Sequence, residues 1–134
     1  MIILSRPSPE FKFLLNRKSK YAVQFDDIFF YPQGRDALLS ALKVFKVKPG
    51  DTVIVPAYIC ESSIEPLRTT GYKIVFIDIN SNLSLDQTKV LDAVKINNAK
   101  AVLVINYFGF SSNTSQLVDL LNPLGVSVIE DCCH

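Results

Sequence analysis

Lys100–Gly109 reads KAVLVINYFG, and this stretch decides the fold expected for the rest of the chain. Its apolar residues are nearly continuous and do not alternate with polar ones, which is typical of a strand buried on both faces. Three other runs share this character, at Asp51–Ala57, Tyr72–Ile79 and Gly125–Asp131. We therefore predict four strands, each covered on both faces of a sheet.

The segments between these runs have helical spacing. Apolar stripes occur at Ala37, Leu38, Ala41, Leu42 and Phe45, at Ile64 and Leu67, at Leu91 and Val94, and at Leu117, Leu120 and Leu121. We expect Pro66 in the first turn of its helix, where a proline is tolerated. Ser84 and Gln87 have the spacing of a capping box. Because strands that alternate with helices form parallel sheets, the predicted fold is α/β. It has three layers, with a mostly parallel sheet between two layers of helices (α-β-α).

The bulk composition limits the classes of protein that fit. The 134 residues suit a single domain, and we assign residues 1–32 to an N-terminal arm or edge segment and residues 33–134 to one partial domain. Hydrophobic residues make up 49% and charged residues 20%, as in globular proteins and unlike disordered ones. A net charge of +1 offers no basic surface for nucleic acid, and the apolar runs fall short of the ~20 residues of a membrane span.

Three cysteines bear on the cellular compartment. Cys132 and Cys133 are adjacent, and neighbouring residues rarely meet disulfide geometry. Reduced thiols are the simpler interpretation, so we expect a cytoplasmic protein.

Ligands bind beyond the carboxyl ends of the strands in open parallel sheets. We therefore looked for chemistry in the residues that follow each run, at 56–60, 78–80, 106–109 and 130–134, and at the helix start PQGRD (32–36). Gly34, Arg35 and Asp36 open that helix, and its free N–H groups and dipole form a potential anion site. An ordinary helix start, with an acid in the first turn, explains the same residues. Neither a G-x-G-x-x-G motif nor a Walker A lysine is present, which weighs against a nucleotide site.

The final segment, IEDCCH, brings an acid pair, two thiols and a histidine together. Asp131 ends a buried strand, where its carboxylate either faces a cationic ring nitrogen of a ligand or caps a following helix. His134 is either a hydrogen-bond donor to that ligand or a terminal residue. With Cys60, the two thiols and His134 raise the question of a metal, but the C-x-x-C spacing of structural zinc sites is absent.

In this order and at these gaps, the motifs resemble the DegT/DnrJ/EryC1/StrS family of sugar aminotransferases. These are pyridoxal-5′-phosphate (PLP) enzymes of the aspartate aminotransferase fold, and the resemblance covers about Gly34–His134. The segments that carry it are GRDALL (34–39), GDTVIVP (50–56), VFIDI (75–79), NYFG (106–109) and VIEDCCH (128–134). The resemblance implies that the chain is the N-terminal part of the large domain of such an enzyme.

The resemblance also implies cofactor-binding positions. Arg35 and Asp36 stand where backbone N–H groups of the family hold the PLP phosphate, and Gly34 shapes the turn. Asp131 matches the acid that pairs with the pyridinium nitrogen. His134 matches the residue near the phenolic oxygen of the ring. Cys60 falls where many members stack an aromatic side chain, so either Tyr58 supplies the ring instead or this face of the cofactor is covered more loosely. Asn106 replaces the histidine of the family's H-x-x-G.

The implied activity is amination of a nucleotide-linked keto sugar by an amino-acid donor, in polysaccharide biosynthesis, by a homodimer. The family's Schiff-base lysine lies downstream of the acid, and no lysine follows Asp131 here. We therefore expect the chain alone to be inactive. We also expect it to self-associate, because a sheet cut after Asp131 leaves apolar faces and a strand edge uncovered. A non-catalytic α/β binding or interaction module derived from such an enzyme is the alternative, which Cys60 and Asn106 favour. A flavodoxin-like nucleotide-binding domain is a third, which the missing glycine motif disfavours.

Overall fold

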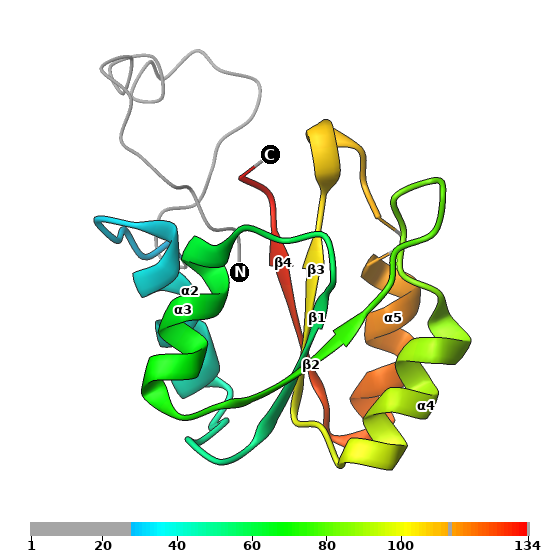
Figure 1. Ribbon diagram of the computed structural model, residues 1–134, viewed down its shortest axis with the longest axis horizontal. Coiled ribbons are helices and arrows are strands. Elements are labelled where there is room, and N and C mark those ends of the chain that lie inside the picture. The colour runs from blue at the N-terminus through cyan, green and yellow to red at the C-terminus, as the bar shows by residue number, and fades with distance from the viewer. Residues whose placement is uncertain (1–27, 113, 134) are drawn as a thin grey trace.

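A computed structural model of the chain describes residues 28–112 and 114–133. In this part four parallel strands form one sheet, in the order β2-β1-β3-β4 (Figure 1). The strands are β1 Thr52–Pro56, β2 Lys73–Ile77, β3 Ala101–Ile105 and β4 Ser127–Asp131. The helices are α2 Gly34–Val44, α3 Glu61–Thr70, α4 Gln87–Asn97 and α5 Thr114–Leu121, with short 3₁₀ turns η2 Tyr107–Gly109 and η3 Asn122–Leu124. The predicted α/β fold and its alternating elements are confirmed.

The strand register brings the carboxyl ends of the central strands to one edge. Strand β3 pairs with β4 from Ala101↔Ser127 to Ile105↔Asp131, so these two strands end level with one another. Strand β1 pairs with β3 through Val53↔Ala101, which places the end of β1 within one residue of the same line. The loops that follow the three strands therefore share one rim.

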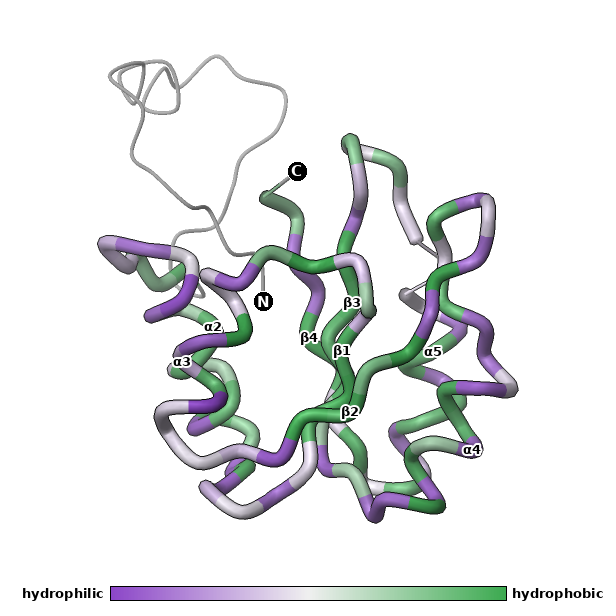
Figure 2. The backbone as a smooth tube through the Cα atoms, viewed as in Figure 1, coloured by the Kyte–Doolittle hydropathy of each residue, from purple (hydrophilic) through white to green (hydrophobic). Residues whose placement is uncertain are grey.

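Two helical layers sandwich the sheet (Figure 1). Helices α2 and α3 cover one face and α4 and α5 the other, and each face has its own core. On the α2/α3 face, Leu42 and Leu67 pack on alternate residues of β1 and β3; on the α4/α5 face, Leu121 packs on the residues between them. Along the backbone the strands are hydrophobic for most of their length, whereas the helices switch repeatedly between hydrophobic and hydrophilic residues (Figure 2). That pattern is what one-sided burial of a helix requires.

Burial on both faces is confirmed for β1 and β3, whose residues are all buried. The same prediction is wrong for β2, in which Phe76 is 51% exposed and Ile77 alone is fully buried. It also overstates the burial of β4, of which only Ile129 is fully buried. Both are edge strands of the described sheet, with a neighbour on one side only. An apolar run does not reveal whether its strand is central or at an edge.

Two predictions about helix ends are also wrong. Helix α3 begins at Glu61, so Pro66 is its sixth residue and not part of its first turn. Proline has no N–H to donate to the carbonyl group four residues earlier, so this position lacks one helical hydrogen bond. The side chain of Pro66 is buried. Helix α4 is capped by Asp86, whose Oδ1 accepts from the N–H groups of Thr88 and Lys89, and not by a capping box starting at Ser84.

The N-terminal segment is described only from Ile28 onward, so most of the predicted arm of residues 1–32 lies outside the described residues. The boundary between residues 32 and 33 therefore stays a prediction. Among the described helices, none is long and apolar enough to cross a membrane.

Candidate functional site

A cavity of about 620 Å³ opens at the carboxyl ends of the strands, on the α2/α3 face of the sheet. Its volume lies within the range of small-molecule and cofactor pockets. The start of α2, the loop after β1, the start of α3 and the ends of β3 and β4 all contribute to it. The lining residues are Pro32, Gln33, Gly34, Arg35, Leu38, Ile59, Cys60, Ser62, Ser63, Leu103, Ile105, Asp131 and Cys133.

The start of α2 presents backbone donors to this cavity. The Gln33 carbonyl accepts from the N–H groups of Asp36 at 3.1 Å and Ala37 at 3.3 Å, and no side chain caps the helix. No described residue accepts a hydrogen bond from the N–H of Gly34 or Arg35, and both residues line the cavity. Unpaired N–H groups at a helix start, reinforced by the helix dipole, bind anions such as phosphate.

Asp131 supplies an acid to the cavity at the end of β4. Its register partner Ile105 also lines the cavity. One carboxylate oxygen, Oδ1, accepts from the N–H of Cys133 at 2.9 Å. No described residue donates to Oδ2. The capping interpretation is therefore met by a local turn and not by a described helix, while the second oxygen is available to a ligand.

Cys60 and Tyr58 lie in the loop after β1, with different exposure to the cavity. Cys60 is the N-cap residue of α3, and its exposed side chain lines the cavity. Tyr58 is 59% exposed and is not a lining residue. Its ring packs instead on that of Tyr107, with centroids 5.5 Å apart. None of the described residues that line the cavity is aromatic, so the expected replacement of a stacking ring by Tyr58 is not what the structure shows.

Tyr107 connects the ends of β3 and β1, and the sequence analysis missed it. Its side chain is only 2% exposed, and its hydroxyl donates to the carbonyl oxygen of Tyr58. Burial, together with the nearby Tyr58, Asp131 and Cys60, raises the pKa of Tyr107 to about 12. The hydroxyl therefore stays protonated and keeps this hydrogen bond at neutral pH. The available signal was the pair of aromatic residues in NYFG, of which Tyr107 is the second residue after the strand.

A second polar group lies on the opposite face of the sheet. The side chain of Asn106 forms hydrogen bonds with Glu130, Cys132 and Ser112. Thr114, the first residue of α5, also donates to Glu130. The sequence analysis singled out Asn106 but missed its partners, because they are brought together only when β3, β4 and α5 pack.

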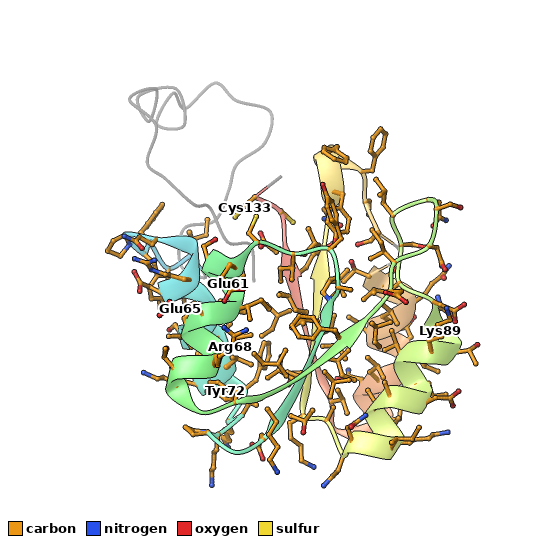
Figure 3. The ribbon with its side chains drawn as sticks, in the orientation of Figure 1. Glu61, Glu65, Arg68, Tyr72, Lys89 and Cys133 are labelled. Atoms are coloured by element: carbon orange, nitrogen blue, oxygen red, sulfur yellow. The ribbon has the colours of Figure 1, made fainter. Side chains whose placement is uncertain are left out.

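Four of the six predicted site residues meet at the cavity: Gly34, Arg35, Cys60 and Asp131. Asp36 is exposed, does not line the cavity and uses its N–H within the first turn, so its assignment stays a prediction. His134 lies outside the described residues. Cys133 ends the described chain at the same end of the molecule as Glu61, the first residue of α3 (Figure 3).

The thiols do not form a metal site in the described part of the chain. All three cysteines are exposed and none forms a disulfide. No cluster of three or more histidine, cysteine, aspartate or glutamate side chains suited to a metal ion occurs among the described residues. The groups that converge on the cavity are thus backbone N–H donors, hydroxyls, thiols and one carboxylate.

Residues 31–134 match the DegT/DnrJ/EryC1/StrS aminotransferase family. The chain belongs to this family. The match begins beside the helix start that lines the cavity and runs through the acid at the end of β4. The family assignment made from the sequence is therefore confirmed.

The matched segments of curated relatives are a little under one third identical to the chain. A UDP-N-acetyl-3-dehydro-α-D-glucosamine 3-aminotransferase from Acidithiobacillus ferrooxidans is 29% identical over 101 residues, which is 75% of this chain and 27% of that protein. An arginine decarboxylase from Bacillus cereus is 29% identical over 118 residues, covering 81% of this chain and 26% of that protein. The chain spans about a quarter of the length of these relatives.

Solved structures of DegT-type enzymes have the same fold. NtdA from Bacillus subtilis, solved with bound pyridoxamine phosphate, has a TM-score of 0.66 and 27% identity over 74% of this chain and 23% of that chain. GDP-4-keto-6-deoxy-D-mannose-3-dehydratase from E. coli, solved with bound hydrated PLP, has a TM-score of 0.64 and 26% identity over 74% of this chain and 27% of that chain. Both neighbours hold a form of the same cofactor.

Proposed function

We propose that this chain is part of a PLP-dependent aminotransferase that transfers an amino group from an amino-acid donor to a nucleotide-linked keto sugar. The family match supports the reaction, and the relative that acts on a UDP-linked dehydro sugar supports the class of substrate. The neighbours solved with PLP or pyridoxamine phosphate support the cofactor. The chemistry of the cavity gives independent support, because its polar groups match both ends of this cofactor.

The observation that carries the proposal is the pairing of an anion site and an acid in one cavity. The N–H groups of Gly34 and Arg35 would hold the phosphate at the start of α2. Asp131, at the end of β4, would accept a hydrogen bond from the protonated ring nitrogen through Oδ2, the carboxylate oxygen without a described donor. A carboxylate close to a ring nitrogen favours the protonated, cationic form of that nitrogen.

The remaining lining residues suit the planar ring between these two groups. Leu103 and Ile105 form an apolar floor from β3 that excludes water beneath the ring, and Ile59 adds to the wall. Ser62 and Ser63 place hydroxyls at the start of α3. When bound, PLP itself supplies an electron sink for the carbanion formed at the substrate carbon. The protein's part is to orient the ring and to keep its nitrogen protonated, and Asp131 is the group placed for that.

Pyridoxine 5′-phosphate is the sharpest probe of this pocket, because it lacks the aldehyde and cannot react with lysines elsewhere on the chain. We expect saturable binding, measured by calorimetry, and about tenfold or more weaker binding to Asp131→Asn. The matched control is Asp119→Asn, the same change on the exposed side of α5 on the other face of the sheet. Equal affinity of wild type and Asp131→Asn would contradict the proposed role. A non-catalytic binding module would give the same binding but no transfer of an amino group.

We also propose a cytoplasmic homodimer. Support for self-association comes from large aromatic side chains on the described surface, with Phe29 at 66%, Phe108 at 65% and Phe110 at 70% exposure. Phe108 and Phe110 are close together in the chain just after β3, and exposed large apolar groups commonly mark interaction surfaces. Light scattering across a hundredfold range of protein concentration should show a mass above that of the 15.0 kDa chain. A mass that stays monomeric throughout would contradict it.

A further inference from the structure

Asn106 makes the maximum number of hydrogen bonds that a carboxamide side chain offers. Its Oδ1 accepts from the N–H of Ser112 at 3.0 Å and from the Ser112 hydroxyl at 2.8 Å. Its Nδ2 donates to Oε1 of Glu130 at 2.9 Å and to Sγ of Cys132 at 3.2 Å. Two donors and two acceptor lone pairs are thus all used. The orientation of the amide follows, because the backbone N–H of Ser112 must face an oxygen and the Glu130 carboxylate must face a nitrogen.

The partners of Asn106 flank Asp131 on both sides in the chain. Side-chain hydrogen bonds hold residues 130 and 132, and the backbone N–H of Asn106 donates to the carbonyl oxygen of Asp131 at 2.9 Å. One residue therefore holds three consecutive positions at the end of β4.

The geometry of the strand determines the face of the sheet on which each of these three side chains lies. Successive side chains along a strand point to opposite faces of the sheet. Glu130 is held on the α4/α5 face, where Thr114 of α5 also donates to its Oε1 at 2.7 Å. Cys132 is held by the same amide as Glu130. Asp131, the residue between them, lies on the other face and lines the cavity.

We propose that Asn106 is a positioning residue, which aims the Asp131 carboxylate at the cofactor ring by holding the residues on either side of it from the opposite face of the sheet. The hydrogen-bonded clamp stands on the structure alone, whereas the target of Asp131 rests on the proposed function. Asn106 does not line the cavity, so it acts on a ligand only through Asp131.

The test uses Asn106→Asp, which keeps the shape and the acceptor for Ser112 but removes both donors. Pyridoxine 5′-phosphate, at saturating concentration, is titrated by its absorbance, which differs between the protonated and the neutral ring. In the wild type we expect the ring nitrogen to have a higher pKa when bound than when free. In Asn106→Asp we expect this pKa to fall by about one unit or more, which is a tenfold change in protonation.

The direction of this change separates positioning from simple electrostatics. The carboxylate that N106D introduces would by itself favour the protonated ring and raise its pKa. A fall can therefore come only from displacement of Asp131. The other ionisable groups around the cavity, among the residues that the structure describes, are the same in every variant: Arg35, Cys60, Cys133 and Tyr107. Asn97→Asp, on α4 and far from the cavity, is the matched control and should titrate like the wild type.

A second variant restores the clamp with its polarity reversed. In the double variant Asn106→Asp with Glu130→Gln, the new amide at position 130 donates to the new carboxylate at position 106. The double variant should recover most of the wild-type ring pKa, which loss of stability alone would not explain. If circular dichroism shows that N106D does not fold, the double variant is titrated in its place.

The outcomes separate the two claims. If folded N106D titrates the ring like the wild type while Asp131→Asn lowers its pKa to that of the free ligand, the positioning role is overturned and the proposed function stands. If Asp131→Asn itself leaves the ring pKa unchanged, the proposed contact between Asp131 and the ring is overturned. A fall in N106D with recovery in the double variant supports both.

Discussion

The two faces of the sheet treat their polar groups in opposite ways at the same level of the strands. On the α4/α5 face, Asn106 and Thr114 both donate to Oε1 of Glu130, so side chains from two other parts of the fold hold this carboxylate. On the α2/α3 face, at the ends of the same two strands, Asp131 keeps an oxygen without a described donor beside a cavity of about 620 Å³.

This difference teaches where stability and function separate in the molecule. Glu130 and Asp131 are neighbours of the same charge, but because strand side chains alternate between faces, Glu130 enters internal hydrogen bonds and Asp131 lines the cavity. A part-buried polar group that is held by hydrogen bonds from other elements contributes to the fold, whereas a carboxylate oxygen without a described donor at a cavity is available for binding.

The largest effect in this comparison is expected from removing Glu130. Glu130→Ala leaves the donors of Asn106 and Thr114 without their shared acceptor, and we expect a loss of about 1–3 kcal/mol in the free energy of unfolding. Asp131→Ala loses only an exposed hydrogen bond to the N–H of Cys133, and we expect a loss below about 1 kcal/mol. Urea unfolding of both variants measures the two values. Equal losses would remove the distinction between the two faces.

A smaller, pH-dependent effect is expected from Tyr107, the buried hydroxyl on the cavity side. Its pKa is raised from 10.0 to about 12 in the folded protein, chiefly by burial. Between these pH values the unfolded chain loses this proton and the folded chain keeps it, so the free energy of unfolding falls as pH rises. Tyr72, whose pKa burial also raises, adds to this fall.

Tyr107→Phe tests this pH dependence, because it removes the hydroxyl and keeps the ring. We expect it to cost about 0.5–1.5 kcal/mol at pH 7, through the lost hydrogen bond to Tyr58. The difference from the wild type should shrink as pH rises from 10 towards 12, because the wild type alone pays for keeping this phenol protonated. Urea midpoints at pH 7, 10 and 11 give the comparison, and a difference that does not change with pH would contradict the raised pKa.

Sequence patterns were sufficient to predict the layers of this fold, because the burial pattern of each strand and helix is visible within a few residues. The run at Ala101–Ile105 and the stripe of α2 each report burial within a few residues. Edge status is not local: Phe76 is exposed because no described strand pairs beyond β2. The cap of α4 was misassigned because Ser84 and Asp86 are both suitable capping residues, and the loop geometry decided between them.

The site was predictable to the extent that its residues follow strands or open a helix. Arg35 and Asp131 were found by that rule, and the structure brings them to one cavity. Ser112 and Thr114 carry no such mark, and their role depends on how α5 packs against β4. Tyr58 was expected at the cofactor because of its chemistry, but its ring packs on Tyr107, whose position the sequence did not indicate.

The cavity draws on Pro32 near the beginning of the described chain and on Cys133 at its end. On a ribosome, α2, β1 and α3 emerge before β4, so the backbone donors of α2 can face solvent while the acid of β4 is still unsynthesised. A nascent chain at that stage would attract phosphate without distinguishing a pyridine ring from any other anion. It would also expose the edge of β3, a central strand once folding is complete, to chaperones or to other nascent chains. The acid therefore joins these backbone donors only when β4 pairs with β3.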